Sequence, residues 1–179
     1  NAIPSEGLGR FILSDWSTIE PHPVSDFAEP AVSYFRLWLQ GKFDTTKWIN
    51  CFVGLGPGLT PSGDDFIGGA MITLRILGNT NSVNQIWDIC CPLSHALGNR
   101  ISHAHLASAA SGFGSASLHK TINALMQGHD VTLRSALQDL DKIGHTSGWD
   151  ALAGAVTVCQ AYLEDSNLRN RLQTAPNLV

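Results

Sequence analysis

A glycine-rich stretch decides the fold, and over residues 54–65 it reads Gly54-Leu55-Gly56-Pro57-Gly58-Leu59-Thr60-Pro61-Ser62-Gly63-Asp64-Asp65. Its first ten residues hold four glycines and two prolines, a density that excludes regular structure and predicts a sharply bent loop. Ser62 and Asp65 have the spacing of a capping box, in which each side chain bonds a backbone amide of the first helical turn. The sequence therefore predicts a helix that begins near Gly63.

The run that follows is apolar on every side of such a helix and ends at the expected stop, Gly78. A helix without a polar face belongs inside a core. Its positive end would open into the glycine-rich loop, an arrangement that favours a bound anion. Asp64 and Asp65 lie at that same end, so the alternatives of a bound cation, or of an acid and a base, stay open.

The same signature occurs again further along the chain. Residues 147–155 read Ser147-Gly148-Trp149-Asp150-Ala151-Leu152-Ala153-Gly154-Ala155, and they share the pattern S-G-x-D-x-x-x-G-A with residues 62–70. Each copy follows a glycine and a threonine, which are Gly58 and Thr60 in the first copy and Gly144 and Thr146 in the second. An apolar run follows the second copy too. The sequence therefore predicts two related, buried central helices from a weak internal repeat.

Each copy places an aspartate four residues before a glycine, as Asp65 before Gly69 and Asp150 before Gly154. Residues four apart lie on one face of a helix. Because glycine lets helix backbones approach closely, we expect the two helices to cross at Gly69 and Gly154. Both aspartates would then line one cleft between two helix N-termini.

The composition excludes several classes of protein. The chain has 179 residues, a formal charge of −4 and only eleven Lys and Arg, which stand singly, so neither nucleic acid nor an anionic membrane is an expected partner. The four cysteines have no C-x-x-C spacing and indicate thiols of a reducing compartment. No apolar run reaches the roughly 18 residues of a membrane span, and no secretory signal is visible. The expected location is the cytoplasm.

The remaining pattern predicts an all-α globular domain of about seven helices, with at most one or two short strands. Residues 1–26 are interpreted as a linker or a remnant of a preceding region, and 27–179 as the helical domain with a polar tail from Asp165. Lys47–Val53 fits either a strand or the end of a helix. Pro92 is expected to bend or break the helix over 83–99. The other predicted helices cover 27–41, 100–112, 117–127, 130–142 and a stretch from the second motif to about Glu164.

The candidate site residues come from the two motifs and their surroundings. Asp64, Asp65 and Asp150 are the candidates for catalysis, and Asp64, Asp65 or His145 would handle a proton or a metal. Arg100 is the only basic residue between Arg75 and Lys120, and its planar fork suits a carboxylate or a phosphate. The candidates for ligand binding are Gly58, Thr60, Ser62, Gly63, Arg100, His145, Thr146, Ser147 and Gly148. No cofactor is assigned, and a divalent metal stays an alternative to an anion.

The two motifs resemble the family of the AllH-type subunit of oxamate carbamoyltransferase, over roughly residues 30–165. The resemblance implies a role in a bacterial multi-subunit system that phosphorolyses oxalurate to oxamate and carbamoyl phosphate during anaerobic allantoin use. The implied partners are other protein subunits and a small anion, phosphate or carbamoyl phosphate. The resemblance supplies no residue-level mechanism.

A plainer interpretation stands beside this one. Both S-x-x-D motifs would be capping boxes only, each worth on the order of 1 kcal/mol. The chain would then be a non-catalytic helical partner or assembly protein whose chemistry lies elsewhere. This interpretation leaves Asp64 and the long Gly/Pro loop unexplained.

Overall fold

The computed structural model describes residues 3–16, 20, 22–165 and 168. Within them the chain forms seven α-helices and two short 3-10 helices and no strand, so the all-α prediction is confirmed. Lys47–Cys51 is one of the 3-10 helices (η2), which settles the ambiguous stretch. The other is η1 (Gly9–Ile12), and the α-helices are α1 (Pro23–Leu39), α2 (Ser62–Ile76), α3 (Thr80–Ala96), α4 (Arg100–Ala110), α5 (Ala116–Gln127), α6 (Asp130–Leu140) and α7 (Ser147–Glu164).

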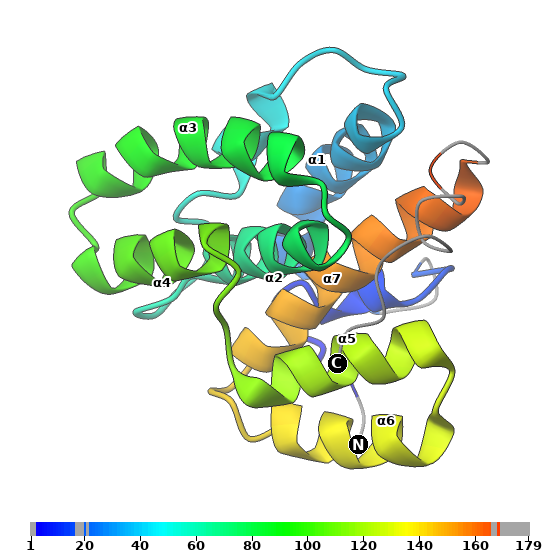
Figure 1. Cartoon of the computed structure of the whole chain (residues 1–179). Helices are drawn as coiled ribbons and strands as arrows, with labels where there is room; N and C mark the ends of the chain where they lie inside the picture. Colours follow the sequence, from blue (N-terminus) through cyan, green and yellow to red (C-terminus); the bar gives the residue numbers. More distant parts are fainter. Residues whose placement is uncertain (1–2, 17–19, 21, 166–167, 169–179) are drawn as a thin grey trace.

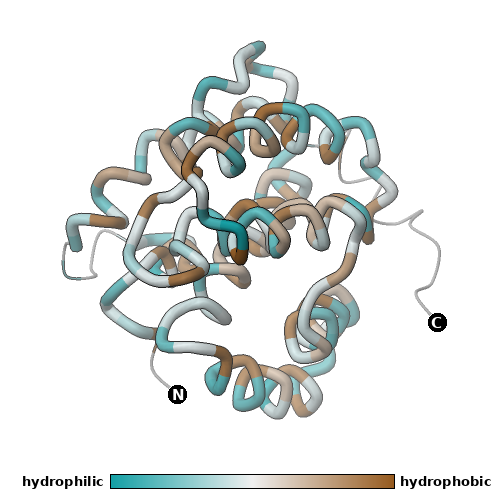
Figure 2. The backbone as a smooth tube through the Cα atoms, turned by 90° about the vertical axis from the view of Figure 1, so that its left-hand side faces the viewer, coloured by the Kyte–Doolittle hydropathy of each residue, from teal (hydrophilic) through white to brown (hydrophobic). Residues whose placement is uncertain are grey.

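The two motif helices, α2 and α7, form the centre of the molecule and make its most extensive helix contact (Figure 1). Every residue of α2 from Ser62 to Leu74 is buried, as are residues 148–155 of α7. The surrounding helices carry both apolar and polar residues along their length, as expected of helices with one exposed side (Figure 2). The prediction of two buried central helices is therefore confirmed.

The crossing of α2 and α7 depends on glycine. A Cβ atom added at Gly69 would lie 1.8 Å from the carbonyl oxygen of Ala151, and one added at Gly154 would lie 1.9 Å from that of Phe66. Both contacts are with backbone, which has no rotamer to adopt. The expectation that the helices cross at these two glycines is confirmed.

The outer helices cover this centre as pairs. α3 and α4 lie side by side on one side of the molecule, where both contact α2. α5 and α6 form a hairpin below that contacts α7, and α1 packs on α7 and η2 (Figure 1). None of the described helices combines the length and the apolar character that a membrane crossing requires.

Two helices differ from their predicted extent. α1 begins at Pro23 rather than at residue 27, with proline in the first turn, where its missing N–H costs nothing. α3 begins at Thr80 because the Asn79 side chain caps it, accepting a hydrogen bond from the Ser82 N–H at 3.2 Å. α3 also continues through Pro92, so a helix break there is wrong. Proline removes one helical hydrogen bond, and the buried Cys90 and Ser94 hold the helix against the core on both sides.

The segment before α1 contributes to the core. Leu8 and Phe11 are fully buried, and η1 packs against α7. Arg10 is 6% exposed and binds Asp26 at 2.9 Å and Glu29 at 2.8 Å, which joins the segment to α1. Its origin as a linker or a remnant of a preceding region stays a prediction. Most of the polar tail expected after Glu164 lies outside the described residues.

Candidate functional site

The S-x-x-D motifs are not capping boxes. Ser62 and Ser147 are the first residues of α2 and α7 rather than the residues before them, and neither helix has a side-chain hydrogen bond at its N-cap. The N–H groups of Asp64 and Asp65 both bond the carbonyl oxygen of Pro61 instead. The serine hydroxyls are therefore free to act elsewhere, and the capping prediction is wrong.

Each motif aspartate is approached by hydroxyls from both motifs. Asp65 interacts with Thr60 of its own motif and with Ser147 of the other. Asp150 interacts in the same way with Thr146 and with Ser62. The two copies thus exchange serines across the helix crossing, and Thr60 Oγ1 lies 3.3 Å from Ser147 Oγ where they meet. The repeated sequence motif therefore corresponds to a nearly two-fold symmetric arrangement of the Thr, Ser and Asp side chains in the structure.

Both carboxyl groups are buried and incompletely paired. Asp65 is 2% exposed and Asp150 is fully buried, and Oδ2 of each accepts no hydrogen bond from the described residues. Burial raises the pKa of Asp65 to about 7; the hydroxyls of Ser147 and Thr60 oppose this rise, and the charge of Asp150 adds to it. Burial likewise raises the pKa of Asp150 to about 6. Near neutral pH the pair can therefore hold and release a proton.

A pocket of about 590 Å³ opens in front of these carboxyl groups, and we call it the hydroxyl pocket. It contains six of the predicted ligand-binding residues, together with neighbours from the N-terminal segment and the loop. Asp65 and Asp150 do not line it themselves but lie behind its four hydroxyl side chains. The lining residues are Glu6, Gly7, His22, Val24, Pro57, Gly58, Leu59, Thr60, Ser62, His145, Thr146 and Ser147.

The backbone amides of two predicted ligand-binding glycines, Gly63 and Gly148, already make hydrogen bonds within the protein. The Gly63 N–H donates to the carbonyl oxygen of Leu55 at 2.9 Å, and the Gly148 N–H donates to that of Ile143 at 3.2 Å. A Cβ atom added at either glycine would lie within 2.4 Å of a backbone oxygen, of Phe52 or of Leu140. Both glycines are therefore needed for close packing of the chain, and their amides are not available to a ligand.

Asp64 faces a different part of the molecule from its neighbour Asp65. Its Oδ1 accepts a hydrogen bond from the Gly54 N–H at 2.9 Å, and its Oδ2 accepts one from the Ser102 hydroxyl. It lines a small cavity of about 160 Å³ between the loop, α3 and α4. Burial raises its pKa, and these two bonds oppose that rise. Asp64 thus ties the loop to α4, and the structure does not bring it to the hydroxyl pocket.

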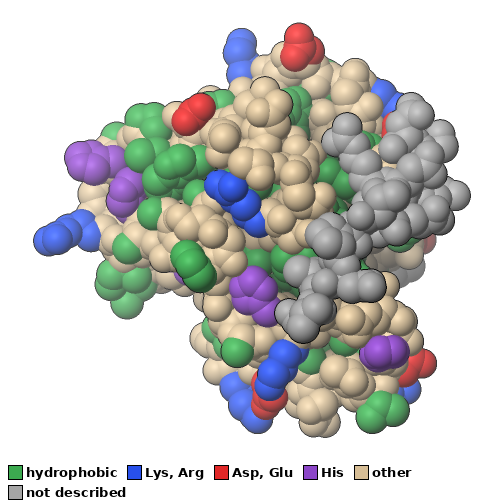
Figure 3. Space-filling view, in the orientation of Figure 1, with side chains coloured by type: hydrophobic (Ala, Val, Ile, Leu, Met, Phe, Trp, Pro, Cys, Tyr) green, Lys and Arg blue, Asp and Glu red, His purple; other side chains and the backbone are tan. Residues whose placement is uncertain are grey.

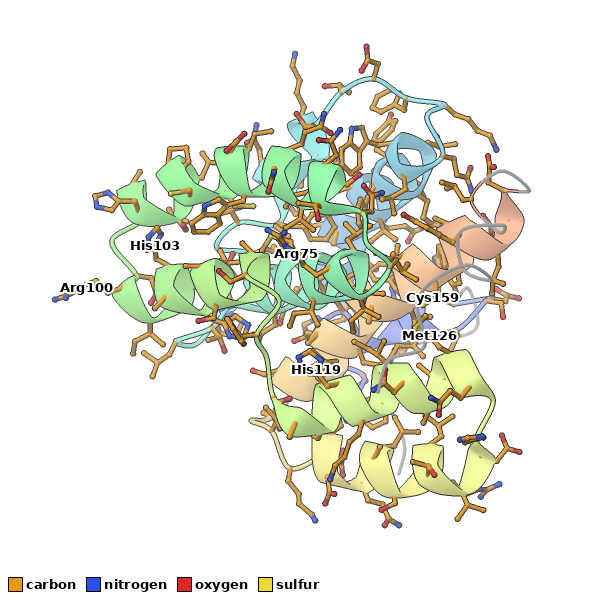
Figure 4. The ribbon with its side chains drawn as sticks, viewed as in Figure 1. Arg75, Arg100, His103, His119, Met126 and Cys159 are labelled. Carbon is orange, nitrogen blue, oxygen red and sulfur yellow. The ribbon has the colours of Figure 1, made fainter. Side chains whose placement is uncertain are left out.

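Arg100 also lies away from the motifs. It stands at the outer end of α4 and points away from the centre of the molecule (Figure 4). There it lines a separate hollow with His95 and His103. His103 accepts or donates a hydrogen bond at 2.8 Å with Ser94. The structure does not unite this arginine with the two motifs.

The sequence interpretation missed five residues around the site. Glu6, Gly7, Leu8 and His22 come from the segment before α1, and Glu6 bonds His145 at 2.7 Å. The Leu8 N–H donates to Asp150 Oδ1 at 2.5 Å, and Gly7 has φ +73° with no room for a Cβ beside that carboxylate. The fifth is His105, whose Nε2 lies 3.3 Å from Asp65 Oδ1. His103 and His105 are two residues apart and therefore lie on different faces of α4. Because one face of α4 had to meet α2, this spacing was the available sign that one of the two histidines would lie near the site.

The charges around the site bear on what it could hold. Within the described part of the chain, no three His, Cys, Asp or Glu side chains are grouped so that they could hold a metal ion. Among the described residues that line the hydroxyl pocket there is no Lys or Arg. On the face drawn in Figure 3, Lys and Arg side chains are scattered rather than gathered in one patch. The polar side chains in and behind the hydroxyl pocket are hydroxyls, carboxyl groups and histidines.

Comparison with known proteins gives a family but no solved relative. No solved structure matches the chain. The family model described as oxamate carbamoyltransferase subunit AllH matches residues 52–159, a range that includes both motifs and α2 to α6. Because this match covers more than half of the sequence, the chain belongs to the AllH family of oxamate carbamoyltransferase subunits.

Proposed function

We propose that this chain works as a subunit of an oxamate carbamoyltransferase and that its hydroxyl pocket binds a small ligand with a carbamoyl group. The family match supports the first part and implies protein partners. One observation carries the second part. Two buried carboxyl groups, each with an unpaired oxygen, lie directly behind the hydroxyls that line the pocket.

The size of the pocket suits a small molecule. Its volume of about 590 Å³ lies within the range of small-ligand sites, roughly 300–1,000 Å³. Its polar groups converge from the two motifs and from the N-terminal segment, which would hold a ligand from three sides. Carbamoyl phosphate, oxamate and oxalurate are all small enough to enter.

The polarity of the pocket favours the carbamoyl end of such a ligand. A carbamoyl group has two N–H donors, which match carboxylate oxygens, and one carbonyl acceptor, which matches a Ser or Thr hydroxyl. Free phosphate would meet the Glu6 carboxylate, with the two buried aspartates behind the hydroxyls and no Lys or Arg among the described lining residues. We therefore expect carbamoyl compounds to bind more tightly than inorganic phosphate. Of the two anions expected from the sequence, phosphate and carbamoyl phosphate, the pocket favours carbamoyl phosphate.

The carboxyl pair also suits the chemistry of carbamoyl transfer. When the carbamoyl carbon leaves the oxamate nitrogen, that nitrogen must gain a proton, and the reverse reaction must remove it. A carboxyl group with a pKa of about 7 is a suitable donor and acceptor near neutral pH. We assign this role to Asp65, acting through the hydroxyl of Ser147 or Thr60. Asp150 serves as the second, more acidic carboxyl group.

Calorimetric titration of the purified chain with carbamoyl phosphate, oxamate and inorganic phosphate tests the proposal. We expect binding of at least one carbamoyl compound, with phosphate at least tenfold weaker, a difference of about 1.4 kcal/mol. Ser147→Ala should lower the affinity for the carbamoyl ligand by about tenfold. Ser108→Ala, on an exposed serine of α4, is the matched control and should bind as the wild type.

An assembly role is the second candidate, and one observation favours it. Leu59, Leu97 and Ile101 are 67%, 60% and 53% exposed on the glycine-rich loop and at the turn between α3 and α4. The Asn99 side chain joins these two places by donating to the Leu59 carbonyl oxygen at 2.8 Å. A chain that binds none of the three compounds, yet loses its partner subunits on Leu97→Ser, would support assembly over ligand binding.

A further inference from the structure

His105 spans the distance between solvent and the buried Asp65. Its side chain is 36% exposed, whereas that of Asp65 is 3% exposed. The Nε2 atom is itself buried, has no hydrogen-bond partner and lies 3.3 Å from Asp65 Oδ1. One edge of the imidazole ring therefore faces the carboxyl group while the rest of the ring reaches the surface.

Gly68 makes room for this arrangement. It lies three residues after Asp65, on the same side of α2, and a Cβ atom added there would be 3.1 Å from His105 Nε2. The same atom would be 3.6 Å from Ala109 Cβ of α4. A larger residue at 68 would push the ring away from Asp65, so the contact depends on glycine at this position.

Asp65 continues the path inward to the hydroxyl pocket. Thr60 and Ser147 both interact with its carboxyl group, and both line the pocket. From His105 to the pocket there is thus an unbroken series of groups with exchangeable protons: an imidazole, a carboxyl group and two hydroxyls.

The charges that act on His105 and Asp65 come from two neighbouring helices, α2 and α7. Burial lowers its pKa, and the charge of Asp64 opposes that effect. Asp150 of α7 acts on Asp65 from the far side. The charged groups that act on the pair are therefore Asp64, beside Asp65 on α2, and Asp150 on α7.

We propose that His105 is a proton relay that acts through Asp65 and connects the hydroxyl pocket with solvent; this rests on the proposed function. When the ligand nitrogen gains a proton, the hydroxyl of Ser147 or Thr60 gives it and takes the proton of Asp65. The His105 imidazolium then returns its Nε2 proton to the Asp65 carboxylate. The neutral ring regains a proton from water, and the reverse reaction runs the same steps backwards.

The test uses the assembled enzyme, this chain with its partner subunits, and His105→Ala. We expect kcat for carbamoyl transfer to fall at least tenfold with KM within twofold of wild type, and added imidazole to restore most of the rate with saturation. His103→Ala, two residues away and facing Ser94 of α3, should keep its rate and gain nothing from imidazole. Restoration of the rate by imidazole distinguishes a proton relay from a structural contact, because free imidazole can carry a proton but cannot restore the packing of the side chain.

Two further measurements keep the outcome decisive. If His105→Ala melts early, His105→Gln replaces it, and its pH–rate profile should lose the limb that the wild type shows near neutral pH. In the isolated chain, the NMR signals of the His105 ring should show a titration step near pH 7, the pKa of Asp65, and Asp65→Asn should remove this step. A ring without such a step, or a lost rate that imidazole fails to restore, overturns the relay. Absence of ligand binding in the calorimetric experiment would instead overturn the proposed function.

Discussion

Gly69 of α2 lies directly against the backbone of Ala151 of α7, so closely that an added Cβ would come within 1.8 Å of the Ala151 carbonyl oxygen. The equivalent pair with the copies exchanged, Gly154 and Phe66, makes the same contact. The crossing is thus nearly symmetric, and it sets how far apart the two helix N-termini lie. The carboxyl pair and the pocket depend on this spacing.

Gly69→Ala is therefore expected to destabilise the fold by about 3 kcal/mol, the upper part of the usual range for overpacking. Gly68→Ala is the matched control on the same helix, because its nearest neighbour is a movable side-chain atom at 3.1 Å. The helix propensity of alanine, about 1 kcal/mol, offsets part of that contact. Urea denaturation of both variants measures the difference. Equal midpoints would show that the backbone at residue 69 has room to move.

The sequence predicted the centre of this fold because its signals are local. Two apolar runs, each bounded by glycine and without a polar face, predict buried helices, and a glycine four residues after an aspartate lies on the same face as that aspartate. The direction in which each polar side chain points depends on neighbours that the sequence does not reveal. Asp64 and Asp65 are adjacent, yet the first meets Ser102 of α4 and the second meets Ser147.

The remaining differences have the same cause. The capping prediction failed because the serines make tertiary contacts with the opposite motif in place of local ones. The segment before α1 is too short to show a period, and its core contacts arise where η1 packs against α7, with Leu8 and Phe11 fully buried. His105 acquires its position from a glycine on another helix. None of these contacts leaves a pattern in the residues beside it.

Replacing Asp65 with Asn should stabilise the protein at pH 8 and not at pH 3.5. The pKa of Asp65 is about 7 in the fold against 3.8 when unperturbed, so the folded state binds more protons between these values. Its ionisation therefore lowers the free energy of unfolding as pH rises from about 4 to 7, by on the order of 4 kcal/mol at most. Melting curves at both pH values measure this.

Two comparisons sharpen that result. Asp150→Asn should also stabilise the protein at pH 8, but the effect should develop over a narrower pH range, because the pKa of Asp150 is about 6. Asp139→Asn is the control, since Asp139 lies at the surface beside Lys142, which lowers its pKa. A Tm of Asp65→Asn that equals the wild-type value at pH 8 would contradict the burial of an ionised carboxyl group.

Ser102→Ala is expected to cost about 1–3 kcal/mol, because it leaves Oδ2 of the buried Asp64 without its donor. Ser108→Ala removes a serine from the same helix whose hydroxyl only bonds the Ala104 carbonyl oxygen, so its cost should stay within about 0.5 kcal/mol. Guanidinium denaturation compares the two. Ligand affinity should not change in either variant, since Asp64 lies outside the hydroxyl pocket. A lower ligand affinity in Ser102→Ala would show that Asp64 contributes to the ligand site.

Phe11→Ala tests whether the segment before α1 belongs to the folded unit. Phe11 is fully buried and packs edge-on against Trp16 at a centroid distance of 5.2 Å, with Arg10 5.1 Å from its ring centroid. Its truncation should cost about 3–5 kcal/mol, the usual loss for a buried phenylalanine. Phe113, which is 72% exposed, is the matched control, and Phe113→Ala should change stability by no more than about 0.5 kcal/mol.

Calorimetry of Phe11→Ala at pH 7 measures the Tm, for which each kcal/mol corresponds to about 2–4 °C in a chain of this size. The same variant should also weaken a carbamoyl ligand, because η1 and the preceding residues hold Gly7 and Glu6 at the hydroxyl pocket and the Leu8 N–H at Asp150. A Tm unchanged from wild type would show that the segment is a linker whose contacts contribute no stability. A lower Tm with unchanged affinity would instead make the segment part of the core and leave the pocket to the two motifs alone.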